Sequence, residues 1–179
     1  TEDLAVLRDA GLVVRWPLAS PIRASWMRRS EEEQRKRFAK QRSTIEGFFD
    51  DAVAWHAARD NDPTTPGDLR FEAMGPVLAG ERPVFFIANS RGQIEESLAF
   101  SVSRGLKPVI LGGAAAPQCL ASLKAADASV IIHGVHRLPL SRHRAWDDPF
   151  SLALRLHEAG IPFAIAAGDE PAHERGLIH

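Results

Sequence analysis

The chain has 179 residues, of which 45% are hydrophobic and 25% charged, and its formal net charge is -1. These proportions are typical of a globular protein, and the length allows one domain with a sizeable core. A nearly neutral chain has no general electrostatic reason to bind nucleic acid or an anionic membrane surface, so neither partner is expected. No apolar run approaches the roughly 18 residues of a membrane span, and no signal-peptide pattern occurs. With one cysteine, Cys119, no internal disulfide can form, and we expect a cytoplasmic protein in which Cys119 is a small core residue.

The first 80 residues are expected to be mainly helical, with one possible strand. The pattern predicts a helix over residues 4–10, a strand over 12–17 and then a loop. Residues 31–58 form one long helix or two, with apolar positions at Phe38, Ile45, Phe48, Phe49 and Val53. The mixed-sign stretch 28–42 is typical of a solvated helix face. A loop over 61–67 and a helix from 68 or 69 to 78 follow.

The second half, residues 81–179, predicts four strand–helix units. Short apolar runs at 84–88, 109–111, 129–132 and 162–166 are typical of strands buried on both faces. Between the first two runs, the spacing of Ile94, Leu98 and Val102 predicts a helix. Two later helices are predicted between the following runs in the same way. Strands that are separated by one helix each must run parallel, because the connection crosses over the sheet. The fold class is therefore α/β, with parallel strands alternating with helices in a single domain.

A glycine stands at three helix-to-strand junctions. Gly11, Gly105 and Gly160 each occupy the place where a helix must stop before a strand begins. Glycine adopts the left-handed turn of such junctions at the lowest cost, so we expect that conformation at all three.

Ligands of parallel α/β proteins bind at the carboxyl ends of the strands, and that rule selects four clusters. Each cluster also has a structural interpretation. The first cluster is Asn89, Ser90 and Arg91, of which Asn89 and Ser90 contact a ligand or cap the next helix. The second is Gly112 and Gly113, which suit a tight turn. The third is His133, a site residue or a hydrogen-bonded core histidine, with His136, which lies with Arg137 on a loop that is a site segment or simply solvated. The fourth is Asp169 and Glu170, which also suit a helix N-terminus.

The second half resembles the amidohydrolase superfamily, in particular its imidazolonepropionase-like branch. The resemblance lies in the stretches AGERPV (79–84), RGLKPV (104–109), VHRLP (135–139) and WDDPF (146–150), and it covers about residues 80–179. Members of that superfamily are (β/α)8 barrels in which one or two divalent metals activate a water for attack on a C–N or similar bond. The resemblance implies a partial (β/α)8 TIM-type barrel, with the four strands as strands five to eight, the second half of the barrel.

The resemblance also implies where metal ligands would lie. The strand-five histidine of the family aligns with Ile87, a second histidine with Asn89, the strand-six histidine with Gly113, and the strand-eight aspartate with Gly168 or Asp169. No His-x-His occurs, and Ile87 and Gly113 carry no donor, so no metal ligand is assigned. If the chain is an active hydrolase of a small cyclic amide, with zinc, iron or manganese, the catalytic residues are Asp169 and His133. The substrate-binding residues are then Asn89, Ser90, His136 and Arg137.

Three hypotheses remain open at this point. The chain is a C–N hydrolase of this superfamily, or a non-catalytic barrel descendant that binds a small ligand or assembles with another chain, or an unrelated doubly wound α/β protein. A complete barrel needs eight strands and about 250 residues. We therefore expect this incomplete barrel to be completed by further segments of the same polypeptide or by a partner subunit.

Overall fold

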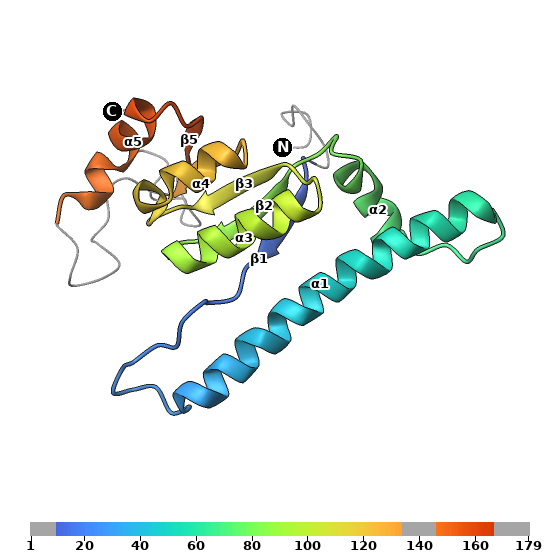
Figure 1. The fold of residues 1–179 in the computed structure, drawn as a ribbon, viewed down its shortest axis with the longest axis horizontal. Coiled ribbons are helices and arrows are strands. Elements are labelled where there is room, and N and C mark those ends of the chain that lie inside the picture. The colour runs from blue at the N-terminus through green and yellow to red at the C-terminus, as the bar shows by residue number, and fades with distance from the viewer. Residues whose placement is uncertain (1–9, 134–145, 167–179) are drawn as a thin grey trace, which may run out of the picture.

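The computed structural model describes residues 10–133 and 146–166, which form one parallel sheet and the helices that connect its strands (Figure 1). Every expected strand is present, and residues 31–61 form one helix rather than two. The helix expected over 4–10 lies outside the described residues. The strands are β1 (Leu12–Arg15), β2 (Val84–Ala88), β3 (Pro108–Gly112), β4 (Ser129–His133) and β5 (Phe163–Ala166). The helices are α1 (Glu31–Asn61), α2 (Leu69–Leu78), α3 (Arg91–Ser103), the short 3-10 helix η2 (Ala116–Gln118), α4 (Leu120–Ala125) and α5 (Asp148–Glu158).

The strand order is β1-β2-β3-β4-β5, and every neighbouring pair is parallel. Right-handed crossovers that always advance in the same direction leave the connecting helices on one face of the sheet. A doubly wound sheet instead reverses its strand order at a switch point, and the described strands contain no such reversal. The architecture is therefore that of part of a TIM-type barrel, and the doubly wound alternative does not account for it.

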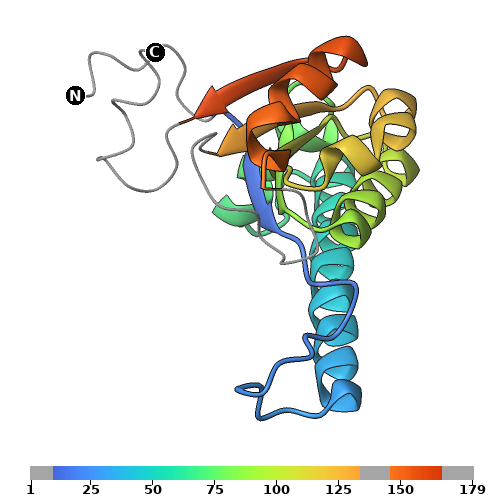
Figure 2. The same cartoon turned by 90° about the vertical axis from the view of Figure 1, so that its left-hand side faces the viewer.

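The core lies between the sheet and its helices. Figure 2 shows α3 and α4, in lime and gold, on the same side of the strands. The strand residues that face them are almost fully buried: Val84, Phe86, Ala88, Ile110, Val130 and Ile132. Buried aliphatic residues of the helices pack against this face: Ile94, Leu98, Leu123, Leu152 and Leu156.

The opposite face of the sheet is apolar, and no described helix covers it. Register pairs Val13 with Phe85, Phe85 with Val109, and Leu111 with Ile131, so these side chains share one face. Val13 is 58% exposed, and the others are half-buried. We call Val13, Phe85, Ile87, Val109, Leu111 and Ile131 the uncovered face. In a closed barrel this face is the packed interior.

The long helix α1 is anchored to the sheet domain through its middle and extends past the sheet at its N-terminal end (Figure 1). Ser30 forms a capping box with Glu33 and starts the helix. Phe49 is buried, and its ring lies 5.1 Å from that of Phe100 in α3. An ion pair of 2.7 Å between Asp50 and Arg104 also joins the two helices.

Two of the three junction glycines have the expected conformation. Gly105 and Gly160 have φ of 64° and 67°. The expectation for Gly11 is wrong, because its φ is not positive. A Cβ at Gly11 would collide with the backbone carbonyl of Pro83, so this glycine serves the close approach of β1 to the chain before β2.

Two expected apolar helix positions face solvent instead. Val102 is 61% exposed and Val53 54% exposed. In α3 the buried face includes Ser97 and Ser101, whose hydroxyls donate to the backbone carbonyls of residues 94 and 97 at 3.0 and 2.8 Å. A serine that bonds its own helix in this way can be buried without an unpaired hydroxyl, which hydrophobic spacing alone does not reveal. None of the described helices is long and apolar enough to cross a membrane.

Candidate functional site

The carboxyl ends of all five strands lie along the same edge of the sheet, because the strands are parallel. Ligands bind at this edge in barrels and in open α/β sheets. We call it the carboxyl-end rim. Its described residues are Arg15 at the end of β1, Asn89 and Ser90 after β2, Gly112 and Gly113 at the end of β3, His133 at the end of β4 and Ala166 at the end of β5.

Ser90 caps helix α3, so the structural interpretation of this residue is confirmed. Its hydroxyl accepts a hydrogen bond from the backbone N–H of Gln93 at 3.3 Å, and the Gln93 side chain accepts from the N–H of Ser90 at 3.2 Å. This reciprocal pair satisfies two of the free N–H groups at the start of the helix. A role of Ser90 in substrate binding stays a prediction.

Asn89 lies beside the cap and points its side chain along the rim. Its backbone carbonyl accepts from the N–H of Ala115 at 3.0 Å, and its Oδ1 accepts from the N–H of Ala114 at 3.5 Å. These bonds hold the residue between the ends of β2 and β3. Its Nδ2 donates to no acceptor in the described part of the chain, and this group is therefore free to donate to a ligand.

The two glycines at the end of β3 make the expected tight turn. Gly112 and Gly113 have φ of 103° and 62°, and the N–H of Gly113 donates to the carbonyl of Ala88 at 3.0 Å. A Cβ built on Gly113 would lie 2.6 Å from Cγ1 of Val130. The buried side chain of Val130 thus leaves no room for a side chain at this position.

His133 is the last residue of β4 and is half-buried. It pairs with Ala166 of β5, and its position in the strand places it on the same face as Ile131. Its ring makes no hydrogen bond to any described residue, which does not support the hydrogen-bonded core interpretation. The three other predicted site residues, His136, Arg137 and Asp169, lie outside the described residues.

The described part of the rim does not fit a divalent metal. Ile87 and Gly113, at two positions that the family resemblance assigns to histidine ligands, contribute no donor atom. Within residues 10–133 and 146–166, no group of three His, Cys, Asp or Glu side chains is placed to hold a metal ion. Zinc and similar metals need several such donors together.

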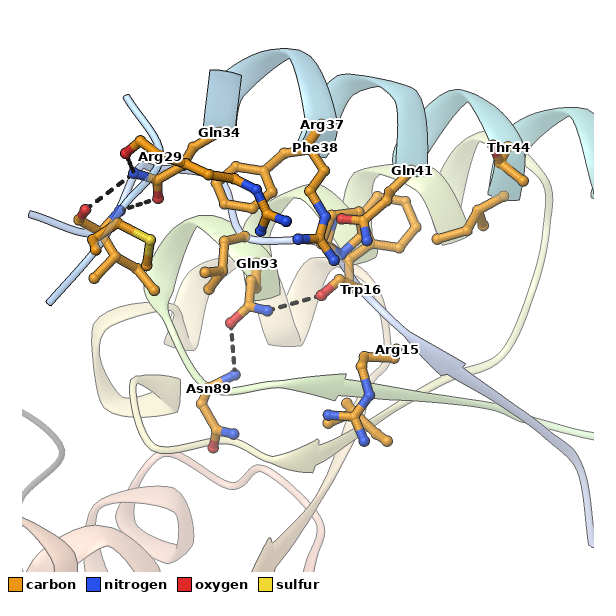
Figure 3. A pocket seen from close by; sticks show the side chains of 16 residues that line it. Arg15, Trp16, Arg29, Gln34, Arg37, Phe38, Gln41, Thr44, Asn89 and Gln93 are labelled. Carbon is orange, nitrogen blue, oxygen red and sulfur yellow. Dashed lines mark hydrogen bonds between the residues drawn. The ribbon is translucent and has the colours of Figure 1, made fainter. Parts of the chain in front are cut away.

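A cleft of about 760 Å³ opens at the β1 and β2 end of the rim, between the sheet and the N-terminal half of α1 (Figure 3). Its lining comes from the ends of β1 and β2, the loop after β1, α1 and the first turn of α3. Apolar and amide side chains line most of it, together with three arginines. The lining residues used below are Arg15, Trp16, Arg29, Gln34, Arg37, Phe38, Ile87, Asn89 and Gln93.

Gln34 fixes the outer wall of the cleft. It is 4% exposed, its Nε2 donates to the carbonyls of Ile22 and Arg29 at 3.2 Å, and its Oε1 accepts from the N–H of Ile22 at 2.9 Å. Both the Nε2 and the Oε1 of Gln34 therefore bind the backbone of the chain that precedes α1. The loop between β1 and α1 is therefore tied to the first turn of α1, and the cleft has a built wall.

Sequence reasoning missed the arginines of this cleft. It treated the stretch 28–42 as a solvated helix face, which holds for Lys36, whose ion pair with Glu32 is exposed. Arg29 and Arg37 are exposed as well, but they also line the cleft. A signal was present, because Gln34, Arg37, Phe38, Gln41 and Ile45 recur at helical spacing and form one side of α1.

No family model matches this chain, and no curated protein matches it in sequence. A crystal structure of an amidohydrolase from Thermotoga maritima MSB8 is similar in fold, with a TM-score of 0.61 and 18% sequence identity. The chain has an amidohydrolase-like fold. The match covers 73% of this chain and 35% of the amidohydrolase, so the chain spans about a third of the length of that protein. At this identity the likeness concerns the fold and not the activity.

Proposed function

We propose that this chain is part of an amidohydrolase-like barrel that binds a small ligand at its carboxyl-end rim without a catalytic metal. The observation that carries the proposal is Gly113. A histidine there would need a Cβ 2.6 Å from Val130, at a φ that side chains rarely adopt. Ile87 also lacks a donor, and a cleft of about 760 Å³ that could accept a ligand opens beside it. The metal positions are degenerate in this proposal, while the binding rim is retained.

Metal analysis combined with an amide-hydrolysis assay tests this proposal. The protein is produced in medium supplemented with zinc, iron and manganese, and bound metal is measured by inductively coupled plasma mass spectrometry. We expect substoichiometric metal and no release of amine or ammonia from a panel of small cyclic amides. A stoichiometric metal whose removal by a chelator abolishes hydrolysis would overturn the proposal.

A second candidate function is metal-assisted hydrolysis of a C–N bond in a small cyclic amide, as in the imidazolonepropionase-like branch. The amidohydrolase-like fold and the position of His133 at the end of β4 favour it. In that case His133 polarises the substrate, and Asp169 binds the metal or acts as general base. The hydrolysis assay above then succeeds, and H133A and D169N each lose turnover.

We also propose that further strands of a longer polypeptide cover the uncovered face. Three observations support this: the side chains of this face are apolar, β1 and β5 each leave a strand edge unpaired among the described residues, and the match covers 35% of the similar amidohydrolase. We expect the 179-residue chain alone to bind the dye 8-anilinonaphthalene-1-sulfonate and to self-associate without a fixed stoichiometry. A 19.6 kDa monomer that does not bind the dye would contradict this. So would a discrete dimer that has lost dye binding, which would identify a second copy as the occupant.

A further inference from the structure

The cleft between α1 and the ends of β1 and β2 carries an unbalanced charge. Its lining contains Arg15, Arg29 and Arg37 and no aspartate or glutamate. None of these three arginines forms an ion pair with a carboxylate of the described residues. Figure 3 shows Arg29 and Arg37 reaching from the loop and the helix into the same space, with Arg15 at the strand end.

The carboxylates near the cleft already have other partners. Glu96 accepts from Arg42 at 2.6 Å and from Nε1 of Trp16 at 3.2 Å. Glu31 pairs with Arg23 at 2.7 Å and with Arg35 at 3.3 Å. Glu33 lies within electrostatic range of Arg29, but its carboxylate accepts from the N–H of Ser30 at 2.8 Å. The positive charge of the cleft is therefore not neutralised by a nearby ion pair.

Guanidinium groups are suited to bind anions. Each offers a planar fork of N–H donors that matches a carboxylate or phosphate, and it stays charged at any physiological pH. Arg29 and Arg37 enter the same space, and an anion between them replaces the repulsion of two positive charges with attraction. Because the cleft is partly open, salt weakens the effect, but the sign of the charge selects an anionic ligand.

Apolar side chains form much of the remaining lining. Trp16 is 2% exposed, and its ring packs against Phe86 and Phe100 with centroids 5.7 and 5.1 Å apart. Phe38 and Ile87 add half-buried apolar surface to the lining. A volume of about 760 Å³ is in the range of small-molecule sites, which combine mostly apolar walls with a few polar groups.

We infer that this cleft binds a small organic anion, whose carboxylate or phosphate contacts Arg29 and Arg37 and whose apolar body lies against Phe38. The inference names the ligand class for the binding role proposed above and rests on it. Inorganic phosphate can contact only the arginines, and a neutral apolar molecule can contact only the apolar side chains.

Isothermal titration calorimetry with matched probes tests the inference. The probes are 4-phenylbutyrate, phenyl phosphate, inorganic phosphate and the neutral 4-phenylbutan-1-ol. We expect an organic anion to bind at least about tenfold more tightly than the alcohol and than inorganic phosphate. Comparison of the two organic anions distinguishes a carboxylate from a phosphate ligand. Equal affinity for the alcohol, or no binding of either organic anion, would overturn the inference.

Charge-removing variants localise the binding. R37Q and R29Q are each expected to weaken binding of the better organic anion at least about tenfold. The matched control is K36Q, which removes the same charge one residue away, on the solvent side of α1, and should leave the affinity unchanged. Circular dichroism checks the fold of each variant. Equal effects of R37Q and K36Q would mean that general charge attracts the probe, which contradicts a built anion site.

The outcomes separate this inference from the proposed function. If a neutral amide binds at the rim while the organic anions do not, the ligand class is wrong and the binding role stands. If a bound metal supports hydrolysis, the proposed function is wrong, whatever the arginine variants show.

Discussion

Gln93 donates from its side-chain Nε2 to the backbone carbonyl of Trp16 at 2.8 Å, across 77 positions of the sequence. The same side chain accepts from the N–H groups of Asn89 and Ser90 at 3.3 and 3.2 Å. One buried amide therefore joins the chain after β1, the chain after β2 and the first turn of α3. This junction forms the floor of the cleft and sets the spacing of its two strand ends.

Replacing Gln93 with methionine should destabilise the protein by about 2–3 kcal/mol, because it leaves the buried carbonyl of Trp16 and two part-buried N–H groups without partners. Urea denaturation followed by circular dichroism measures the free energy of unfolding. Q118M changes an exposed glutamine in the same way and should cost less than about 0.5 kcal/mol. Similar losses in the two variants would mean that Gln93 does not hold the junction.

Gly113 can be tested against a glycine of the same conformation. G105A places a Cβ at φ 64° with nothing within 4 Å, so it should cost only the left-handed strain of about 1–2 kcal/mol. G113A adds the collision with Val130 and should cost about 2–4 kcal/mol. Thermal and urea denaturation compare the two. A G113A variant as stable as G105A would show that a side chain fits where the family resemblance expects a histidine.

Cys119 should behave as a buried, unreactive thiol. Burial raises its pKa to about 11, so only about one molecule in a thousand carries the thiolate at pH 8. Ellman's reagent should react slowly with the native protein and rapidly after urea is added. Because the folded pKa lies above the ordinary value of 9.0, stability should fall as the pH rises from about 9 to about 11, and C119A should lack this decrease. Rapid labelling of the native protein would contradict the assignment.

Asp68, the N-cap of α2, should make the stability of the protein depend on pH in the acid range. Its side-chain hydrogen bond with Arg70 lowers its pKa to about 2 from an ordinary 3.8. A lowered folded pKa means that the stabilisation is complete above the ordinary value and is lost as the pH falls from about 4 to about 2. D68N retains a capping side chain but cannot titrate. Over this interval, D68N should therefore lose less stability than the unmodified protein in urea denaturation, and an equal loss would contradict the link.

The sheet could be predicted from the sequence because its signals are local. Each strand is a short apolar run between turn residues, and one helix between successive runs forces them to be parallel. The left-handed conformation of Gly105, just after the end of α3, follows from the same local rules. Gly11 was misinterpreted because its role is tertiary: the constraint is the carbonyl of Pro83, which lies 72 residues away in the sequence.

The rim was only partly predictable. Asn89, Ser90, Gly113 and His133 were found because ligands bind after parallel strands, and the capping role of Ser90 follows from its position before a helix. The arginines of the cleft were not found. Arg37 and Lys36 are neighbours in one charged stretch, and only the packing of α1 against the loop after β1 gives them different surroundings.

Calorimetry on metal-free protein tests ligand binding without a metal most directly. The protein is treated with a chelator, and 4-phenylbutyrate is then titrated before and after reloading with zinc. Because the contacting groups are arginines and apolar side chains, the affinity should be the same in both states. Binding that appears only after zinc is restored would contradict a metal-independent rim.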